Sequence, residues 1–205
     1  MQKQRTLASE FSLKGKGLHT GGLNIHITFR PAPENHGYKI KRIDLEGQPV
    51  IDALAENVIN TQRGTVVAKN GVQVGTIEHA MAALYAWGID NCLIEVDAPE
   101  FPILDGSSRF FSEEIQKTGV AEQDAPKDFY IVRHKIEVKD EETGASLIIL
   151  PDDKFSMNVL ISFDSPVLSN QYAAMTDISN FHNELAASRT FVFVREIEML
   201  LKNNL

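Results

Sequence analysis

The chain has 205 residues, of which 43% are hydrophobic and 23% are charged, and its formal net charge is -8 at pH 7. These proportions are typical of a globular protein with a sizeable core. The acidic balance argues against a general nucleic-acid binder, which needs a basic surface. No apolar run approaches the roughly 18 residues of a membrane helix, and residues 1–13 lack the apolar core of a signal peptide. We therefore expect a cytoplasmic protein.

The first half of the chain opens with patterns of β-structure. Every second residue within 24–30 is apolar, which predicts a strand with one buried face. Residues 65–74 predict a hairpin, because Asn70-Gly71 can adopt the positive φ angles of a tight type I′ turn.

A short apolar helix is predicted from residue 77 to residue 87, and Gly88 is expected to end it. The Thr76 hydroxyl is the predicted cap of its first turn. After this helix, residues 92–97 predict an apolar strand that contains Cys92, the only cysteine of the chain. We expect that thiol to be buried and inert.

A second helix is predicted within residues 105–119, with Ser107 or Ser108 as its cap and Gly119 as its stop. The polar segment 121–128 contains a proline and has no periodicity, so we place a domain boundary there. Beyond it the patterns predict strands in residues 129–139, 145–150 and 156–163 and a helix in residues 177–187. A short strand is then predicted in residues 189–194 and a final helix in residues 195–205.

Mixed runs of strands and helices predict an α+β fold. We expect two similar α/β-sandwich domains, the first formed by residues 1–124 and the second begun by residues 125–205. The second domain would end on a helix with no return strand. We therefore expect it to be incomplete and the chain to be the first part of a longer protein.

The predicted helix 77–87 begins with a carboxylate beside an imidazole, Glu78 and His79. Consecutive residues project about 100° apart around a helix, so both side chains can border a cleft at its start. Neutral imidazole is a common zinc ligand, and a carboxylate that does not bind the metal can take a proton from the activated water. Two ordinary alternatives stay open: the helix dipole alone favours Glu78, and His79 also fits a surface or hydrogen-bonded core residue.

Several longer stretches occur in one order along the chain: QRTL at 4–7, GKGLHTG at 15–21, RPAPENHG at 30–37, TIEHAMAALYAWGIDN at 76–91, APEFPILDGSS at 98–108 and ASRTFVF at 187–193. Together they closely resemble UDP-3-O-acyl-N-acetylglucosamine deacetylase, the zinc amidase of lipid A synthesis. The resemblance covers the whole chain, and the helix motif combined with GLHTG and RTF is highly specific. It implies a Zn²⁺ cofactor and a small-molecule UDP-linked acyl sugar as the substrate.

The resemblance also implies roles for individual residues. Glu78 matches the general base, His79 matches the first zinc ligand, and Thr190 matches the hydroxyl that polarises the amide carbonyl. The residues expected to bind the substrate are His19 on a loop beside the site, Phe163 near the uridine, and Phe191 and Phe193 at the start of the acyl-chain passage.

Each of these assignments has a structural alternative. Thr190 also fits an ordinary strand residue, since threonine favours strands. Phe191 and Phe193 alternate, so both also fit a core, and His19 also fits a loop residue without a partner. Asp105 falls in the LDGSS motif, but a helix-capping role explains it without catalysis.

The chain departs from the family in one respect. The remaining zinc ligands of the family follow a His-Lys-x-x-Asp-x-x-Gly-Asp pattern on a later helix, which is absent here, as is the late catalytic histidine. Val138 stands four residues after His134, and Ala186 stands four residues after His182, so neither histidine supplies the pattern. Catalytic zinc usually takes three protein ligands, and we therefore expect little activity from this chain alone.

Two functional hypotheses follow. The first is zinc-dependent hydrolysis of the substrate's N-acetyl group with release of acetate, in which Glu78 is the base and Thr190 steadies the oxyanion. The second is a non-catalytic module of the same fold that binds a nucleotide sugar or a protein partner. A zinc assay discriminates between them.

Overall fold

The computed structural model describes residues 2–163, 165 and 167–194. Its contacts divide the chain into two compact units. The chain leaves the first unit after Lys127, forms the second unit from Asp128 to Phe181, and returns to the first unit at His182. A compact unit is not by itself an independently folding domain, so the assignment of domains to residues 1–124 and 125–205 stays a prediction.

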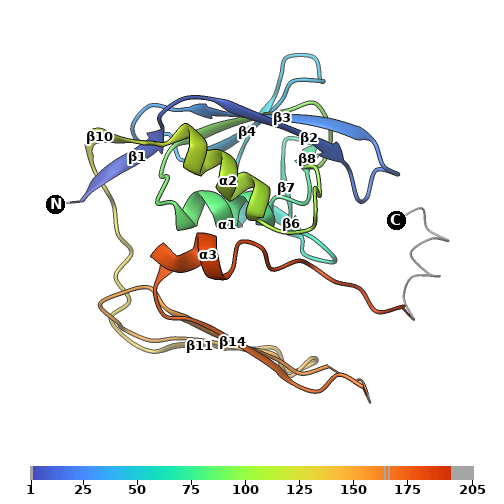
Figure 1. Ribbon diagram of the computed structural model, residues 1–205, viewed down its shortest axis with the longest axis vertical. Helices are drawn as coiled ribbons and strands as arrows, with labels where there is room; N and C mark the ends of the chain where they lie inside the picture. Colours follow the sequence, from blue (N-terminus) through green and yellow to red (C-terminus); the bar gives the residue numbers. More distant parts are fainter. Residues whose placement is uncertain (1, 164, 166, 195–205) are drawn as a thin grey trace. The chain divides into compact units, whose positions relative to one another are not determined.

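The first unit is built around a mixed five-stranded sheet with the strand order β2-β3-β9-β4-β5. Only the pair β4–β9 is parallel. Two helices, α1 and α2, contact each other and lie on one face of this sheet (Figure 1). The bounds of these elements are β2 Phe11–Lys16, β3 Asn24–Pro31, β4 Tyr38–Arg42, β5 Val50–Asp52, β9 Cys92–Val96, α1 Glu78–Ala86 and α2 Arg109–Thr118.

The first unit also contains two smaller sheets, one of three strands in the order β6-β7-β8 and one that pairs β1 with β10. Their strands are β1 Lys3–Leu7, β6 Val58–Asn60, β7 Val66–Lys69, β8 Val72–Val74 and β10 Val120–Pro126, and a short 3₁₀ helix, η1, covers Ala55–Asn57. The combination of helices and mostly antiparallel strands confirms the predicted α+β class.

The alternation predicted for residues 24–30 is confirmed, because every second side chain of β3 is buried. Phe29 lies at the centre of the core. Its ring stacks on that of Phe11 at a centroid distance of 4.7 Å. It packs edge to face against Phe101 and Phe111, at centroid distances of 6.4 Å and 5.8 Å. Such pairs add to the free energy that burial of the rings already supplies.

The hairpin and the thiol also follow the sequence predictions. Strands β7 and β8 pair antiparallel, and both Asn70 and Gly71 have positive φ, at 53° and 79°, as a type I′ turn requires. Cys92 is buried, and burial raises the pKa of its thiol to about 12. Protonated thiol is a poor nucleophile, so this cysteine is structural.

The first helix forms where it was predicted, but its predicted cap is wrong. The backbone of Thr76 is left-handed, with φ at 57°, and α1 has no side-chain cap. The Thr76 hydroxyl instead donates to the Glu100 carboxylate at 3.2 Å. The local sequence predicted that this hydroxyl caps the helix, but it bonds instead to a carboxylate that is distant in sequence.

The contacts divide the chain after Lys127, inside the predicted boundary segment 121–128, but most of that segment is a strand that was not predicted. Residues 120–126 form β10, which pairs antiparallel with β1 at the start of the chain. The pairing reaches one residue further, where the Lys127 N–H donates to the Gln2 carbonyl at 2.9 Å. A partner more than a hundred residues away converts this polar segment into a strand.

Among the described residues of the second unit, the strands form two antiparallel hairpins. The three strand segments predicted in this region each contain a strand, and a fourth strand, β14, was not predicted. The strands are β11 Ile136–Lys139 paired with β12 Ser146–Ile149, and β13 Met157–Ile161 paired with β14 Gln171–Met175.

The segment that returns to the first unit is less regular than predicted. The helix expected over residues 177–187 is limited to a 3₁₀ turn, η2, at Ile178–Asn180 and to α3 at Phe181–Glu184. The strand expected over residues 189–194 does not form. The helix expected over residues 195–205 lies outside the described residues. Among the described residues, no helix is both long and apolar enough to cross a membrane.

Candidate functional site

The predicted catalytic pair lies at the first turn of α1. Glu78 Oε1 is 4.0 Å from His79 Nε2, and the two side chains are 38% and 15% exposed. The second carboxylate oxygen of Glu78 accepts a hydrogen bond of 2.9 Å from the Thr65 N–H. One oxygen is thereby held by the backbone, while the other is directed towards the neighbouring imidazole.

His19 and Glu78 approach each other around Gly64. A Cβ at Gly64 would lie 3.6 Å from Glu78 Oε1, 3.7 Å from His19 Nε2 and 3.9 Å from Thr76 Oγ1. The structure therefore brings the predicted base and one predicted substrate-binding residue to the same small region.

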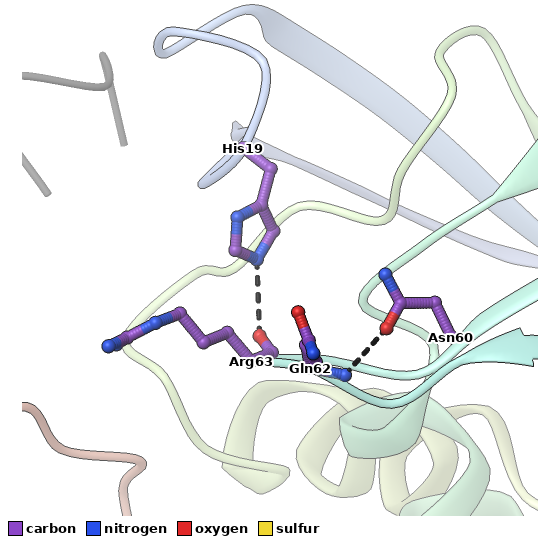
Figure 2. A pocket seen from close by; sticks show the side chains of 4 residues that line it. All are labelled: His19, Asn60, Gln62 and Arg63. Carbon is purple, nitrogen blue, oxygen red and sulfur yellow. Dashed lines mark hydrogen bonds between the residues drawn. The ribbon is translucent and has the colours of Figure 1, made fainter.

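His19 also borders an open hollow of about 500 Å³, which Asn60, Gln62 and Arg63 complete (Figure 2). The His19 ring points at the main chain of Arg63, and its Nε2 lies 3.2 Å from the Arg63 carbonyl oxygen. A carbonyl oxygen only accepts, so Nε2 carries the hydrogen in this contact. The Gln62 N–H donates to Asn60 Oδ1 at 2.8 Å and so orders the far side of the hollow.

Thr190 is held beside the loop that leads into α2. Its N–H donates to the Gly106 carbonyl at 2.7 Å, and a Cβ at Gly106 would lie 3.2 Å from Thr190 Cγ2. Neither contact uses the Thr190 hydroxyl. The proximity of this hydroxyl to Glu78 and His79 stays a prediction.

The turn that receives Thr190 is ordered by Asp105. Its carboxylate accepts hydrogen bonds from the N–H and the hydroxyl of Ser107, at 3.2 Å and 2.7 Å. The Ser107 hydroxyl in turn accepts the Arg109 N–H at 3.1 Å, at the start of α2. The capping role predicted for Asp105 is therefore wrong, because its carboxylate bonds to Ser107 and, among the described residues, to no backbone N–H of α2. Of the two serines predicted as caps, Ser107 is the one whose hydroxyl meets the helix.

The three phenylalanines expected to bind substrate lie in two different units. The rings of Phe191 and Phe193 meet edge to face, with centroids 5.8 Å apart. Phe191 is 59% exposed, which argues against a core role for it. Phe163 follows β13 in the second unit and is half-buried. The substrate-binding roles of all three stay predictions.

Sequence reasoning missed Glu100, which lies within the APEFPILDGSS stretch and is almost completely buried. Its carboxylate accepts hydrogen bonds from the backbone of His19 and from the Thr76 hydroxyl. The stretch resembles the family, but nothing in its local pattern singles out this carboxylate, because its partners are distant in sequence.

His79 has the chemistry of a zinc donor, but the described residues do not complete a zinc site. Across the described ranges, no group of three or more His, Cys, Asp or Glu side chains is arranged to hold a metal ion. His182 Nδ1 lies 2.9 Å from the Ser112 hydroxyl, and the Ser112 oxygen also accepts the Trp87 indole N–H at 2.7 Å. His182 therefore ties α3 to the two longer helices.

Residues 4–205 match the family model described as LpxC: UDP-3-O-acyl N-acetylglycosamine deacetylase. The chain is 64% identical over 205 residues to the bifunctional enzyme LpxC/FabZ of Bacteroides thetaiotaomicron, and this match covers 100% of the chain and 44% of that relative. The corresponding protein of Porphyromonas gingivalis is 62% identical, with the same coverage.

A shorter relative gives a similar result. The chain is 43% identical over 208 residues to the UDP-3-O-acyl-N-acetylglucosamine deacetylase of Methylococcus capsulatus, and this match covers 100% of the chain and 67% of that relative. The chain thus spans less than half the length of the two bifunctional relatives. Because the family model extends over nearly all of its residues, the chain belongs to the UDP-3-O-acyl N-acetylglycosamine deacetylase family.

Proposed function

We propose that the chain carries part of the catalytic machinery of a zinc-dependent amidohydrolase of lipid A biosynthesis. The substrate is UDP-3-O-acyl-N-acetylglucosamine, and water hydrolyses its acetamide to acetate and a free amine. The observation that carries this proposal is the position of Glu78 beside His79 in the first turn of α1, with Glu78 also close to His19. We place the reaction in the cytoplasm.

Glu78 acts as the general base. The Thr65 N–H fixes one carboxylate oxygen, so the other oxygen is available to take a proton from the attacking water. The water oxygen bonds to the amide carbon as Glu78 takes its proton, which gives a tetrahedral oxyanion. When the carbonyl re-forms, the carbon–nitrogen bond breaks, and the proton held by Glu78 passes to the leaving amine.

His79 would hold Zn²⁺ together with ligands that the described residues do not supply. When bound, zinc acts as a Lewis acid and lowers the pKa of a bound water. The Thr190 hydroxyl donates a hydrogen bond to the oxygen that becomes negative in the transition state. His19, Phe163, Phe191 and Phe193 contribute to binding of the UDP-linked acyl sugar.

Glu78→Gln tests the base in the protein made from the full coding sequence. We expect the rate of acetate release to fall about 10²- to 10⁴-fold, the usual contribution of a positioned base, while the zinc content stays unchanged. Glu46→Gln is the matched control, because Glu46 is an exposed carboxylate outside the site. Equal turnover of the wild type and Glu78→Gln would refute the assigned role.

The second hypothesis is supported by the lack of a group of three or more candidate metal ligands within the described part of the chain. A non-catalytic module would bind a UDP-sugar or a protein partner, contain no zinc and release no acetate. Calorimetric binding of UDP-N-acetylglucosamine together with a zinc content near zero would favour that function over hydrolysis.

A further inference from the structure

Glu100 is a buried carboxylate that the proposed chemistry does not use. It is only 2% exposed and lies on the connection between β9 and α2. Its backbone runs parallel to that of Gly75, because the Gly75 N–H donates to the Pro99 carbonyl at 2.9 Å and the Phe101 N–H donates to the Gly75 carbonyl at 3.0 Å. Glu100 therefore lies beside the segment that enters α1.

The carboxylate is surrounded by hydrogen-bond donors. Its Oε1 accepts from the His19 N–H at 3.0 Å, from the Thr20 N–H at 3.0 Å and from the Thr20 hydroxyl at 2.5 Å. Its Oε2 accepts from the His19 N–H at 3.1 Å and from the Thr76 hydroxyl at 3.2 Å. All of these donors are uncharged, so backbone and hydroxyl groups, rather than a cation, compensate this carboxylate.

A buried carboxylate is an energetically unfavourable residue with which to fill a core. Removing a carboxylate from water costs free energy unless hydrogen bonds replace its hydration, and an apolar side chain would fill the space without that cost. Here the hydrogen bonds join two segments distant in sequence, the loop that carries His19 and the entry to α1. This connection, rather than packing alone, accounts for a carboxylate at this position.

The backbones of the two joined segments are adapted to the Glu100 carboxylate. A Cβ at Gly17 would lie 2.1 Å from Glu100 Oε1, so the loop approaches as only glycine allows. Thr76 has a left-handed backbone with φ at 57°, which is rare for a β-branched residue and persists only where neighbours enforce it. The bond from its hydroxyl to Glu100, with the backbone bonds of Gly75, provides that enforcement.

We infer that Glu100 is a positioning residue of the site, an inference that rests on the proposed function. Through the His19 N–H it fixes the loop from which the His19 ring reaches Gly64. Through Thr76 it fixes the backbone two residues before Glu78. Without this acceptor, the donors of His19, Thr20 and Thr76 lose their shared partner, and the His19 ring and the Glu78 carboxylate no longer hold their relative position.

Two substitutions in the protein made from the full coding sequence test the inference. Glu100→Leu keeps the volume and removes the acceptor, and kcat/KM for acetate release should fall about 100-fold, the effect of a misplacement of about 1 Å at a reacting group. Glu100→Gln keeps an oxygen for His19 and Thr20 and offers an N–H that the Thr76 hydroxyl can accept. It should therefore retain activity within about tenfold of the wild type, because the net value of the exchanged bond is small.

Thr6→Val is the matched control for loss of a buried hydrogen-bonding group. The Thr6 hydroxyl donates to the Asn91 carbonyl at 2.7 Å and accepts the Ala32 N–H at 2.9 Å, in a different part of the first unit. Assays run well below the unfolding temperature of every variant should leave Thr6→Val within twofold of the wild type. Equal activities of Glu100→Leu and Thr6→Val would overturn the positioning role.

A second measurement does not depend on turnover. In ¹⁵N-labelled protein the amide hydrogens of His19 and Thr20 should exchange slowly, and Glu100→Leu should speed both exchanges and move the His19 ring nitrogen signals. If these signals and rates stay at their wild-type values, the inference fails even where Glu78→Gln has confirmed the proposed function. If Glu78→Gln keeps full turnover, the proposed function fails, and the exchange data alone decide whether Glu100 positions the loop.

Discussion

Glu78 Oε1 and His19 Nε2 both lie within 4 Å of the position that a Cβ on Gly64 would occupy. The two side chains come from α1 and from the loop between β2 and β3, and each is anchored to the 63–65 segment, Glu78 through the Thr65 N–H and His19 through the Arg63 carbonyl. The space beside Gly64 is therefore the place at which a substitution can disturb both groups together.

Gly64→Ala should reduce activity at least tenfold and lower the free energy of unfolding by about 1–3 kcal/mol, because its φ of 155° is strained for any residue with a Cβ. The new methyl group also enters the space between His19 and Glu78. Gly71→Ala is the control, since Gly71 has a positive φ but nothing within 4 Å of its Cβ position. Acetate release and urea unfolding separate the two effects. Full activity of Gly64→Ala would contradict the importance of this space.

Phe29→Ala should lower the free energy of unfolding by about 3–5 kcal/mol, because it removes a buried ring that contacts three others. Phe129→Ala, at a ring that is 59% exposed, should shift the midpoint much less. Urea unfolding followed by circular dichroism measures both. Similar midpoints for the two variants would show that Phe29 is not the centre of the core.

Cys92 should resist iodoacetamide in the native protein at pH 8 and react fully in denaturant, because burial raises the pKa of its thiol to about 12. Above pH 9 the unfolded thiol ionises while the folded one does not, so the stability contributed by Cys92 falls as the pH rises towards 12. Mass spectrometry gives the extent of labelling. Glu46→Cys, at an exposed position, provides a reactive reference, and equal labelling of both thiols would exclude the buried state.

Asp52 should contribute stability that acid removes. Hydrogen bonds from Lys39 and Lys69 lower the pKa of its carboxyl to about 2. Its stabilising effect is therefore complete above the ordinary value of 3.8 and is lost as the pH falls through about 2. The difference in unfolding free energy between the wild type and Asp52→Asn should shrink between pH 5 and pH 2. Unfolding free energies of the wild type and Asp52→Asn that run parallel across this pH range would contradict the pairing.

The parts of the fold that could be predicted are those whose structure depends on residues close together in the sequence. Alternation in residues 24–30 specifies which face of β3 is buried, and Asn70-Gly71 specifies a turn whose φ angles few other pairs adopt. The juxtaposition of Glu78 and His79 was predictable for the same reason, since neighbours in one helical turn need no other element to bring them together.

The predictions were wrong where the structure of a segment depends on a partner that is distant in the sequence. Polar residues 120–126 become a strand because β1 pairs with them, and Thr76 turns away from its helix because Glu100 accepts its hydroxyl. Glu100 itself was missed because every donor that it meets lies at least 24 residues away. Alternation in residues 189–194 predicted a strand, but the Thr190 N–H bonds to a loop carbonyl and not to a neighbouring strand.

The pairing of β1 with β10 also sets an order of events during synthesis. A ribosome adds about 10 residues per second, so roughly ten seconds pass between the emergence of the two strands. During that interval β1 is a strand without its partner, and such an edge can pair wrongly with other nascent chains. The alternate exposed residues Lys3 and Arg5 place positive charge along it, and charge on an unpaired strand opposes such pairing until β10 has been translated.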